Sequence, residues 1–314
     1  MRVVGSRVVV ALVALGVVSA VRPPLDAQGQ GQDGEQIVFR ASVDLVSVAA
    51  VVRDKRGRVM RTLTREDFQL IDAGQHRPVI DFRSAADADA SVTLLIDGSG
   101  SMASGVAAAR RVSDLLLGQL TPRRDEAALM SFDTRLLMLR PFTSDFDRVR
   151  RGFSDLDVFG ASSVYDAIAG TAGVVADRIG RRRAIVVITD GSDNASTYTA
   201  DEVASIASAI DVPIYVFAVG HDVPGRDERR RQTQTRATSL MQLAEATGGE
   251  FFWAADPADQ DAGVARVIDD LRHQYLIAFE PSTFGGLRRI EVRTRNSDLR
   301  VTSRRWYSSA LPHN

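Results

Sequence analysis

Four short apolar runs alternate with amphipathic segments through the middle of this chain. Residues in the runs are apolar at mostly consecutive positions, which is typical of parallel strands covered by helices on both faces. In the segments between and after the runs, apolar residues recur at the three- and four-residue spacing of a helix face. The pattern predicts a doubly wound α/β fold with a mostly parallel sheet and helices on both faces. The predicted strands are 91–96, 127–132, 184–189 and 213–219, and the predicted helices lie near 112–120, 164–179, 201–210, 238–246 and 259–273.

Both flanks of this segment show strand patterns instead. Residues 37–84 form a β-rich N-terminal segment, and residues 273–308 hold further strand-like runs with the alternation of a half-exposed antiparallel sheet. Neither flank alone has enough apolar residues for a stable core. We therefore expect the two flanks to pack together as one small β-rich domain beside an α/β domain at 88–272.

The N-terminus carries the pattern of a secretory signal peptide over residues 1–27. Arg2 and Arg7 precede an apolar run at 8–18, and small residues follow it. The run is too short for a comfortable transmembrane helix, so an uncleaved anchor is the weaker alternative. Residues 28–36 are polar and glycine-rich and read as a flexible leader. We expect an exported protein, periplasmic, secreted or attached to the cell envelope, with no transmembrane segment after cleavage.

The composition of the chain argues against several kinds of metal site and against nucleic-acid binding. The chain has no cysteine and only four scattered histidines, which argues against thiolate or histidine-rich metal sites. Its net charge of −1 gives no general attraction to nucleic acid or to anionic membranes. The basic stretch 226–236 has no interleaved aromatic residue and is interrupted by Asp227 and Glu228, which favours a solvated loop. We expect no nucleic-acid partner.

Oxygen-bearing side chains gather where the predicted strands end. Asp97, Ser99 and Ser101 directly follow the first run, and the glycines between them allow a tight turn. Such hard oxygens suit Mg²⁺, Ca²⁺ or Mn²⁺. Asp190 follows the third run, and two carboxylates brought close by neighbouring strands would repel each other unless they shared a cation. The loop 160–163 is a third potential contributor.

Together, three segments resemble the von Willebrand factor type A (VWA) domain in order and spacing. They are Asp97-x-Ser99-x-Ser101, the Gly160-Ala161-Ser162 loop and Ile188-Thr189-Asp190-Gly191. The resemblance covers about 88–272, and the β-rich flanks are similar to those of bacterial exported VWA proteins. It implies a metal-ion-dependent adhesion site that holds Mg²⁺, or Mn²⁺ or Ca²⁺. The metal ligands that it implies are Asp97, Ser99, Ser101, Ser162 and Asp190.

This resemblance also implies a function, which is cation-dependent binding of a protein partner. Ser99 and Ser101 would bind the ion directly, and a Glu or Asp of the partner would complete its coordination. Ser162 stands where the family usually has threonine, and it lacks the methyl group that restricts χ1. Ser163 beside it is an alternative ligand, and Asp193 is a further secondary candidate.

Two other functions remain open. One is a serine hydrolase with a triad of Ser99 or Ser101, His221 and an aspartate, or another metal-assisted enzyme. The nucleophile elbow Gly-x-Ser-x-Gly is absent, however, and a phosphate-binding loop is excluded because Lys55 is the sole lysine. We therefore expect no catalytic residue and no enzyme activity. The other alternative is a degenerate site in a purely structural scaffold.

Overall fold

The computed structural model describes residues 45–84, 88–219, 227–282 and 285–308. The predicted signal peptide at 1–27, the leader at 28–36 and His221 lie outside these residues. None of the described helices is both long enough and apolar enough to cross a bilayer.

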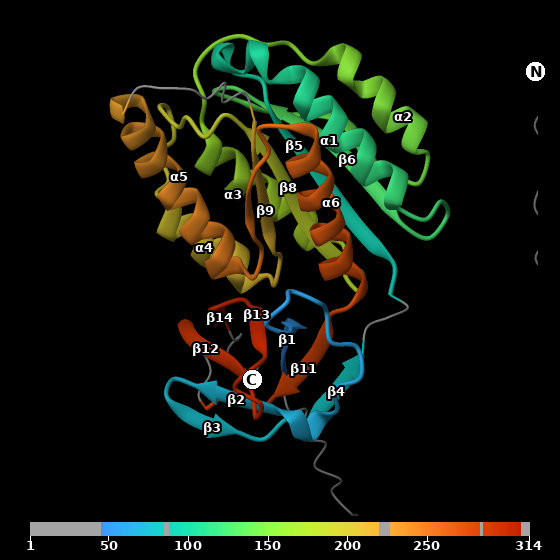
Figure 1. Cartoon of the computed structure of the whole chain (residues 1–314), viewed down its shortest axis with the longest axis vertical. Helices are drawn as coiled ribbons and strands as arrows, with labels where there is room; N and C mark the ends of the chain where they lie inside the picture. The colour runs from blue at the N-terminus through green and yellow to red at the C-terminus, as the bar shows by residue number, and fades with distance from the viewer. Residues whose placement is uncertain (1–44, 85–87, 220–226, 283–284, 309–314) are drawn as a thin grey trace, which may run out of the picture. The chain divides into compact units, whose positions relative to one another are not determined.

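The described residues form a central sheet of six strands in the order β10-β9-β8-β5-β6-β7 (Figure 1). All neighbouring strands run parallel except β7, which is antiparallel to β6. Every residue of β5 is buried, because helices cover both faces of the sheet. The prediction of a mostly parallel α/β sheet is thereby confirmed. The strands are β5 (Ala90–Asp97), β6 (Glu126–Phe132), β7 (Leu136–Thr143), β8 (Arg182–Thr189), β9 (Ile214–Ala218) and β10 (Phe251–Trp253).

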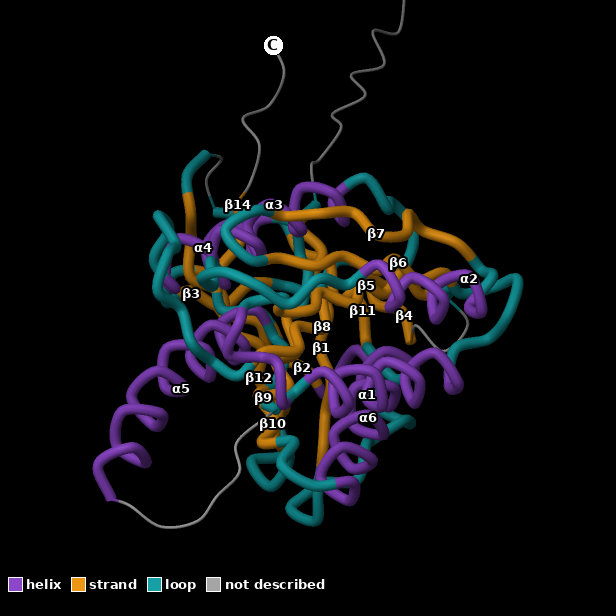
Figure 2. The backbone as a smooth tube through the Cα atoms, turned by 90° about the horizontal axis from the view of Figure 1, so that it is seen from above, coloured by secondary structure: helices purple, strands orange, loops and turns teal. Residues whose placement is uncertain are grey.

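Three helices cover each face of the sheet. Apolar side chains of α1 (Val106–Gln119), α2 (Phe146–Arg151) and α6 (Pro257–Arg272) form one core with the sheet. Those of α3 (Val164–Ala176), α4 (Ala200–Ala209) and α5 (Asp227–Thr247) form a second core on the opposite face. Figure 2 shows α1 and α6 next to each other, as the contacts between them also indicate. Two short 3₁₀ helices, η2 (Gly100–Ser104) and η3 (Gly152–Asp155), complete this domain.

The residues at their first turns explain where two of these helices begin. Thr199 and Glu202 form a capping box at the start of α4, in which each side chain bonds the other residue's backbone N–H. The Asp256 side chain accepts from the backbone N–H of Ala258 and Asp259, and Pro257 occupies the first position of α6.

Strands from the two flanks pair with each other in two antiparallel four-stranded sheets, which we call the β-sandwich. One sheet has the order β13-β1-β11-β4, and the other has the order β14-β12-β2-β3. Their facing side chains make a third core, which includes Phe68, Tyr275 and Tyr307. The elements are β1 (Val46–Arg53), η1 (Arg65–Asp67), β2 (Phe68–Asp72), β3 (Gln75–Arg77), β4 (Asp81–Ser84), β11 (Tyr275–Phe279), β12 (Leu287–Thr294), β13 (Arg300–Ser303) and β14 (Trp306–Ser308).

A buried ion pair joins β1 to α6. Arg53 Nη2 lies 2.5 Å from Asp270 Oδ1, and the two side chains are 4% and 1% exposed. The hydroxyl of Tyr215, on β9, donates to the other carboxylate oxygen of Asp270 at 3.2 Å. Burial raises the pKa of Asp270 to about 6, although Arg53 opposes the shift.

Several elements differ from the sequence expectation. The edge strand β7 and the short helix α2 were not predicted. Strand β7 is only partly buried and contains Pro141, which interrupts the strand pattern in the sequence. The single strand expected near 299–307 is divided into β13 and β14 at the buried Arg304, whose guanidinium bonds the Ser47 carbonyl. From residue 227, the stretch expected as a solvated loop is part of helix α5, so that prediction was wrong.

Candidate metal centre

The ends of β5 and β8 bring the two predicted carboxylates to one edge of the sheet. These strands pair in parallel with Ile96 opposite Ile188, so Asp97 and Thr189 lie at the same level and Asp190 follows one residue later. The condition on which the sequence prediction rested, that the two strands are neighbours, is therefore met. Ligands of open α/β sheets bind at this kind of edge, beyond the carboxyl ends of the strands.

Asp97 is the buried centre of the site, with a side chain that is inaccessible to solvent. Its Oδ1 atom accepts from the backbone N–H of Ser99 at 2.9 Å. Its Oδ2 atom accepts from the hydroxyls of Thr189 at 2.6 Å and Ser162 at 3.1 Å. Burial raises the pKa of Asp97, and the negative charge of Asp190 adds to the increase. The carboxylate is thus held in place by three donors, all of them uncharged.

Ser99 and Ser101 present their hydroxyls together at the start of η2. The two Oγ atoms lie 3.1 Å apart, Ser99 being buried and Ser101 exposed. The backbone at Gly98 permits this turn, because a Cβ atom there would lie only 2.8 Å from the carbonyl oxygen of Asp157. Ser99 and Ser101 thus come from the loop after β5, with the Ser101 hydroxyl next to that of Ser99.

The loop before α3 presents Ser162, and not Ser163, to Asp97. Ser162 Oγ donates to Asp97, and the Ser162 backbone N–H donates to Asn194 Oδ1 at 2.9 Å. Ser163 is buried at the start of α3, and its backbone N–H donates to the carbonyl of Asp133. Gly160 allows the loop to turn, with a φ of +87°.

Asp190 and Asp193 lie on the loop after β8 and make different contacts. Asp190 Oδ1 accepts from the backbone N–H of Ser192 at 2.8 Å. Asp193 Oδ1 accepts from the backbone N–H of Val164 at 2.8 Å and from the hydroxyl of Ser196 at 2.5 Å. Its contacts therefore tie Asp193 to the N-terminus of α3, where a carboxylate is favourable.

The oxygen atoms of these side chains are suitable ligands for a hard divalent cation. Within the described residues, no Lys, Arg or His forms an ion pair with Asp97 or Asp190, so the two carboxylates have no positive partner from the chain itself. The same residues contain no group of three or more His, Cys, Asp or Glu arranged to hold a metal. A cation at this edge would consequently be held by two carboxylates and by serine hydroxyls, all hard oxygen ligands.

Sequence reasoning missed two residues that organise the site. Thr189 donates to Asp97 Oδ2, and its Oγ1 atom accepts from the backbone N–H of Gly191 at 3.0 Å. The sequence signal for Thr189 is its hydroxyl, which stands at the end of the otherwise apolar run 184–189. Asn194 fixes the Ser162 backbone from 32 residues away, and no local pattern indicates that contact.

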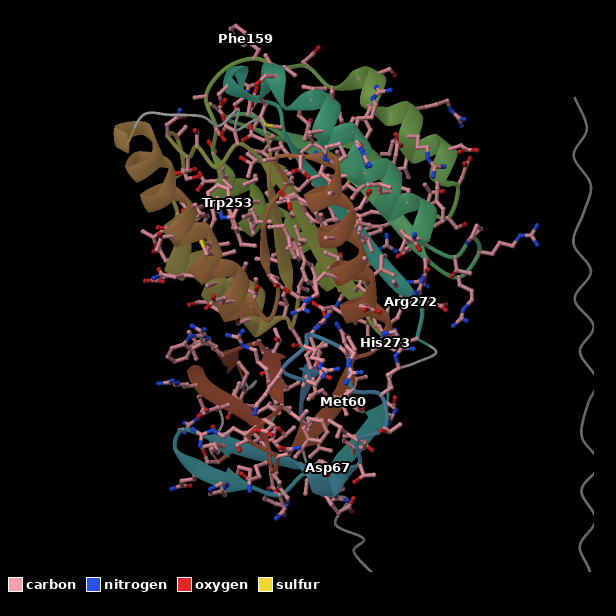
Figure 3. The ribbon with its side chains drawn as sticks, in the orientation of Figure 1. Met60, Asp67, Phe159, Trp253, Arg272 and His273 are labelled. Atoms are coloured by element: carbon pink, nitrogen blue, oxygen red, sulfur yellow. The ribbon has the colours of Figure 1, made fainter. Side chains whose placement is uncertain are left out.

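An exposed aromatic residue lies beside the site. Phe159 is 80% exposed, and Figure 3 shows it extending away from the sheet. Its backbone N–H donates to the carbonyl of Gly98 at 2.7 Å, and the backbone N–H of Gly100 donates to the carbonyl of Gly160 at 3.0 Å. These bonds join the loop that carries Phe159 to the loop that carries Asp97, Ser99 and Ser101.

Comparison with known proteins agrees with this arrangement. Residues 92–192 match the family model described as von Willebrand factor type A domain, and this match includes Asp97, Ser99, Ser101, Ser162 and Asp190. The chain therefore contains a VWA domain.

Several solved structures are similar to parts of the chain. The conserved hypothetical protein BatB from Bacteroides thetaiotaomicron is 18% identical, with 59% of this chain and 98% of that chain covered and a TM-score of 0.47. The von Willebrand factor type A protein from Catenulispora acidiphila is 13% identical, with 87% of this chain and 76% of that chain covered and a TM-score of 0.48. The vWF domain of the type V pili tip protein Mfa5 from Porphyromonas gingivalis is 20% identical, with 34% of this chain and 39% of that chain covered and a TM-score of 0.30. A search of curated proteins gave no match.

Proposed function

We propose that the VWA domain is a divalent-cation-dependent protein-binding module whose site is the candidate metal centre. Asp97, Ser99, Ser101, Ser162 and Asp190 would hold Mg²⁺, or Mn²⁺ or Ca²⁺. The observation that carries the proposal is the buried Asp97 carboxylate, surrounded by neutral donors and close to a second carboxylate, with no basic partner for either among the residues that the structure describes. Such an arrangement is stabilised by a cation.

A cation held here would keep a coordination position for an acidic side chain of a partner protein. Mg²⁺ takes six oxygens and keeps several waters when protein ligands are few. Asp97, Asp190 and the three serine hydroxyls supply five oxygens, which leaves the sixth position for an oxygen of a partner. The exposed Phe159 beside the site supports a protein partner, because an aromatic residue at a rim contributes apolar contact area when a second protein covers it.

We also propose that the protein acts outside the cytoplasm. The signal-peptide pattern of residues 1–27 supports export to the periplasm, the medium or the cell envelope. The acidic partner would then be another exported or envelope protein.

The first test is cation-dependent stability of the full chain. Thermal unfolding is measured in Mg²⁺, in Mn²⁺ and in EDTA for the native sequence, for Asp97→Ala and for Asp147→Ala. Asp147 is a matched control because it is an exposed aspartate on α2, outside the site loops. We expect both cations to raise the melting temperature of the native protein and of Asp147→Ala but not of Asp97→Ala. An identical melting temperature of the native protein with and without cation would refute the metal centre.

The second test asks whether the bound cation accepts a carboxylate. Water-proton relaxation reports water molecules bound to protein-held Mn²⁺, so it is measured while a short glutamate-containing peptide is added. Displacement of water by the glutamate would lower the relaxation enhancement, whereas the matching glutamine peptide would leave it unchanged. Cation binding with no response to the glutamate peptide would favour a scaffold role.

A further inference from the structure

The β-sandwich contains a pocket of about 320 Å³ that lies outside the VWA domain. Three arginines and one histidine line this pocket together with a single carboxylate, and Leu70 contributes to its apolar floor. The charged and titratable residues of the lining are Arg65, Arg77, Arg295, His76 and Glu66.

The three arginines come from segments that the β-sandwich brings together. Arg65 lies on η1, and Arg77 lies on β3 opposite Leu70 of β2. Arg295 follows the last residue of β12, and its backbone N–H donates to the carbonyl of Asp67, which Figure 3 labels. The convergence therefore depends on pairing between the N-terminal and C-terminal flanks and exists only in the folded protein.

Each guanidinium is fixed by one hydrogen bond that leaves other donors available. Arg295 Nε donates to the carbonyl of Glu66 at 2.6 Å, Arg65 Nη2 donates to the carbonyl of Val79, and Arg77 Nη2 donates to Gln75 Oε1 at 3.1 Å. A guanidinium has five N–H donors, so most of the donors of this cluster are not used by the described residues. Holding these long side chains in place reduces the entropy lost when they bind a ligand.

Charge balance in the pocket favours an anion. The lining has three guanidinium groups against one carboxylate, a net charge of +2 without the histidine. Within the described residues, neither Arg65 nor Arg295 forms an ion pair, whereas Arg83 and Arg293 of the same β-sandwich each pair with a carboxylate two residues away. The Arg77 guanidinium lies 3.7 Å from Asp72.

The carboxylate of Asp72 is largely engaged elsewhere. It accepts hydrogen bonds from the Tyr307 hydroxyl at 2.8 Å and from the Ser282 backbone N–H at 2.9 Å. The Nε atom of Arg77 is buried and faces Asp72 Oδ2 at 3.7 Å, so Arg77 offers the pocket its Nη donors and not Nε. The pocket therefore holds more positive charge and more N–H donors than its own residues satisfy.

We infer that this pocket binds a phosphate-class oxyanion, supplied either by a soluble phosphate monoester or by the phosphate headgroup of a lipid. Guanidinium groups recognise such anions through paired N–H donors. A phosphate monoester offers three terminal oxygens and can therefore accept from arginines on several sides, whereas a carboxylate offers two oxygens in one plane. The site is separate from the candidate metal centre and does not depend on a cation.

Two probes distinguish the sources of the phosphate group. Binding of glycerol 3-phosphate to the full chain is measured by calorimetry, and binding to phosphatidylcholine vesicles with and without phosphatidic acid is measured by sedimentation. Both experiments contain EDTA, so that no cation at Asp97 recruits phosphate, and a salt concentration of about 0.15 M screens weak surface attraction.

The variants are the double substitution Arg65→Gln with Arg295→Gln, the single substitution Arg65→Lys, and the control Arg293→Gln. Arg293 lies on β12 and is 57% exposed, but it does not line the pocket. We expect saturable binding that weakens at least tenfold in the double variant and less in Arg65→Lys, which keeps the charge but loses the paired donors. Arg293→Gln is expected to bind within twofold of the native protein.

The outcomes separate clearly. Binding of glycerol 3-phosphate supports a soluble ligand, and binding of phosphatidic acid vesicles alone supports a lipid headgroup. Absence of saturable binding to both probes overturns the inference. Binding that survives unchanged in the double variant also overturns it, because the anion would then be bound elsewhere on the protein.

Discussion

Replacing Asp97 with asparagine tests whether its carboxylate is there for a cation or for the fold. Asparagine has nearly the same size as aspartate, and its amide oxygen can still accept from the Ser99 backbone N–H. The hydroxyls of Ser162 and Thr189 can rotate to accept from the amide nitrogen. Asp97→Asn therefore removes the charge and retains most of the hydrogen bonds.

The expected effect has opposite signs with and without the cation. In EDTA the native protein buries the Asp97 charge near Asp190 with no positive partner from the described residues, so removing the charge is expected to stabilise the protein by about 1–3 kcal/mol. In Mg²⁺ at about 100 times its Kd, the native protein gains about 2.7 kcal/mol, and the variant gains nothing. One kcal/mol shifts the melting temperature of a domain of this size by about 2–4 °C, so the native protein is expected to gain about 5–11 °C from Mg²⁺.

Thermal unfolding of the native protein, Asp97→Asn and the control Asp147→Asn, each in EDTA and in Mg²⁺, measures both effects. The control exchanges an exposed aspartate for asparagine and is expected to follow the native protein in both conditions. If Asp97→Asn is less stable than the native protein in EDTA, the carboxylate is a structural cap and the reasoning fails. An Asp97→Asn protein that responds to Mg²⁺ as the native protein does would remove Asp97 from the ligand set.

Three further predictions follow from other buried polar contacts. Since the folded pKa of Asp270 is about 6, above its ordinary value of 3.8, the stability that it contributes is fully present below about pH 4 and is lost as the pH rises through 6. A pKa difference of one unit corresponds to about 1.36 kcal/mol, so the difference in unfolding free energy between the native protein and Asp270→Asn is expected to change by about 3 kcal/mol over this pH range. Urea unfolding measures it, and a difference that stays constant with pH would contradict the prediction. Replacing the buried group by Arg53→Met with Asp270→Leu and Tyr215→Phe, so that no buried hydroxyl loses its acceptor, is expected to leave stability at pH 8 unchanged or raised by about 1–4 kcal/mol. A large loss in urea unfolding would show that the ion pair stabilises the fold. Thr189→Val removes a donor to Asp97 and an acceptor for the Gly191 N–H, so it is expected to lower the free energy of unfolding in EDTA by about 1–3 kcal/mol. Calorimetric titration is expected to show a change in Mg²⁺ affinity of less than tenfold. A larger loss of affinity would make Thr189 a ligand.

Much of the architecture was predictable because buried parallel strands leave a strong local pattern. β5 and β8 appear in the sequence as apolar runs, and each is followed by an aspartate at the point where the strand ends. Parallel strands align their carboxyl ends, so two such aspartates meet whenever the strands are neighbours. The partly buried β7 lacks that pattern, because its side chains face solvent along much of its length.

Other features depend on contacts between distant residues, which no local pattern encodes. Ser162 and Ser163 are chemically identical, and only the course of the loop before α3 decides that Ser162 bonds Asp97. The arginine-lined pocket is a stronger case, because Arg295 bonds a carbonyl 229 residues earlier in the chain. Such contacts become visible only when the flanks have paired.

Strand periodicity and residue chemistry in the sequence thus determined the α/β sheet, the β-rich flanks and the oxygen-bearing residues at the strand ends, because these properties are local. Tertiary structure alone decided which serine approaches Asp97, that Thr189 and Asn194 hold the site together, and that three arginines line one pocket of the β-sandwich. These depend on side-chain directions and long-range pairing, which are set when the strands pack and not by the order of residues along any one segment.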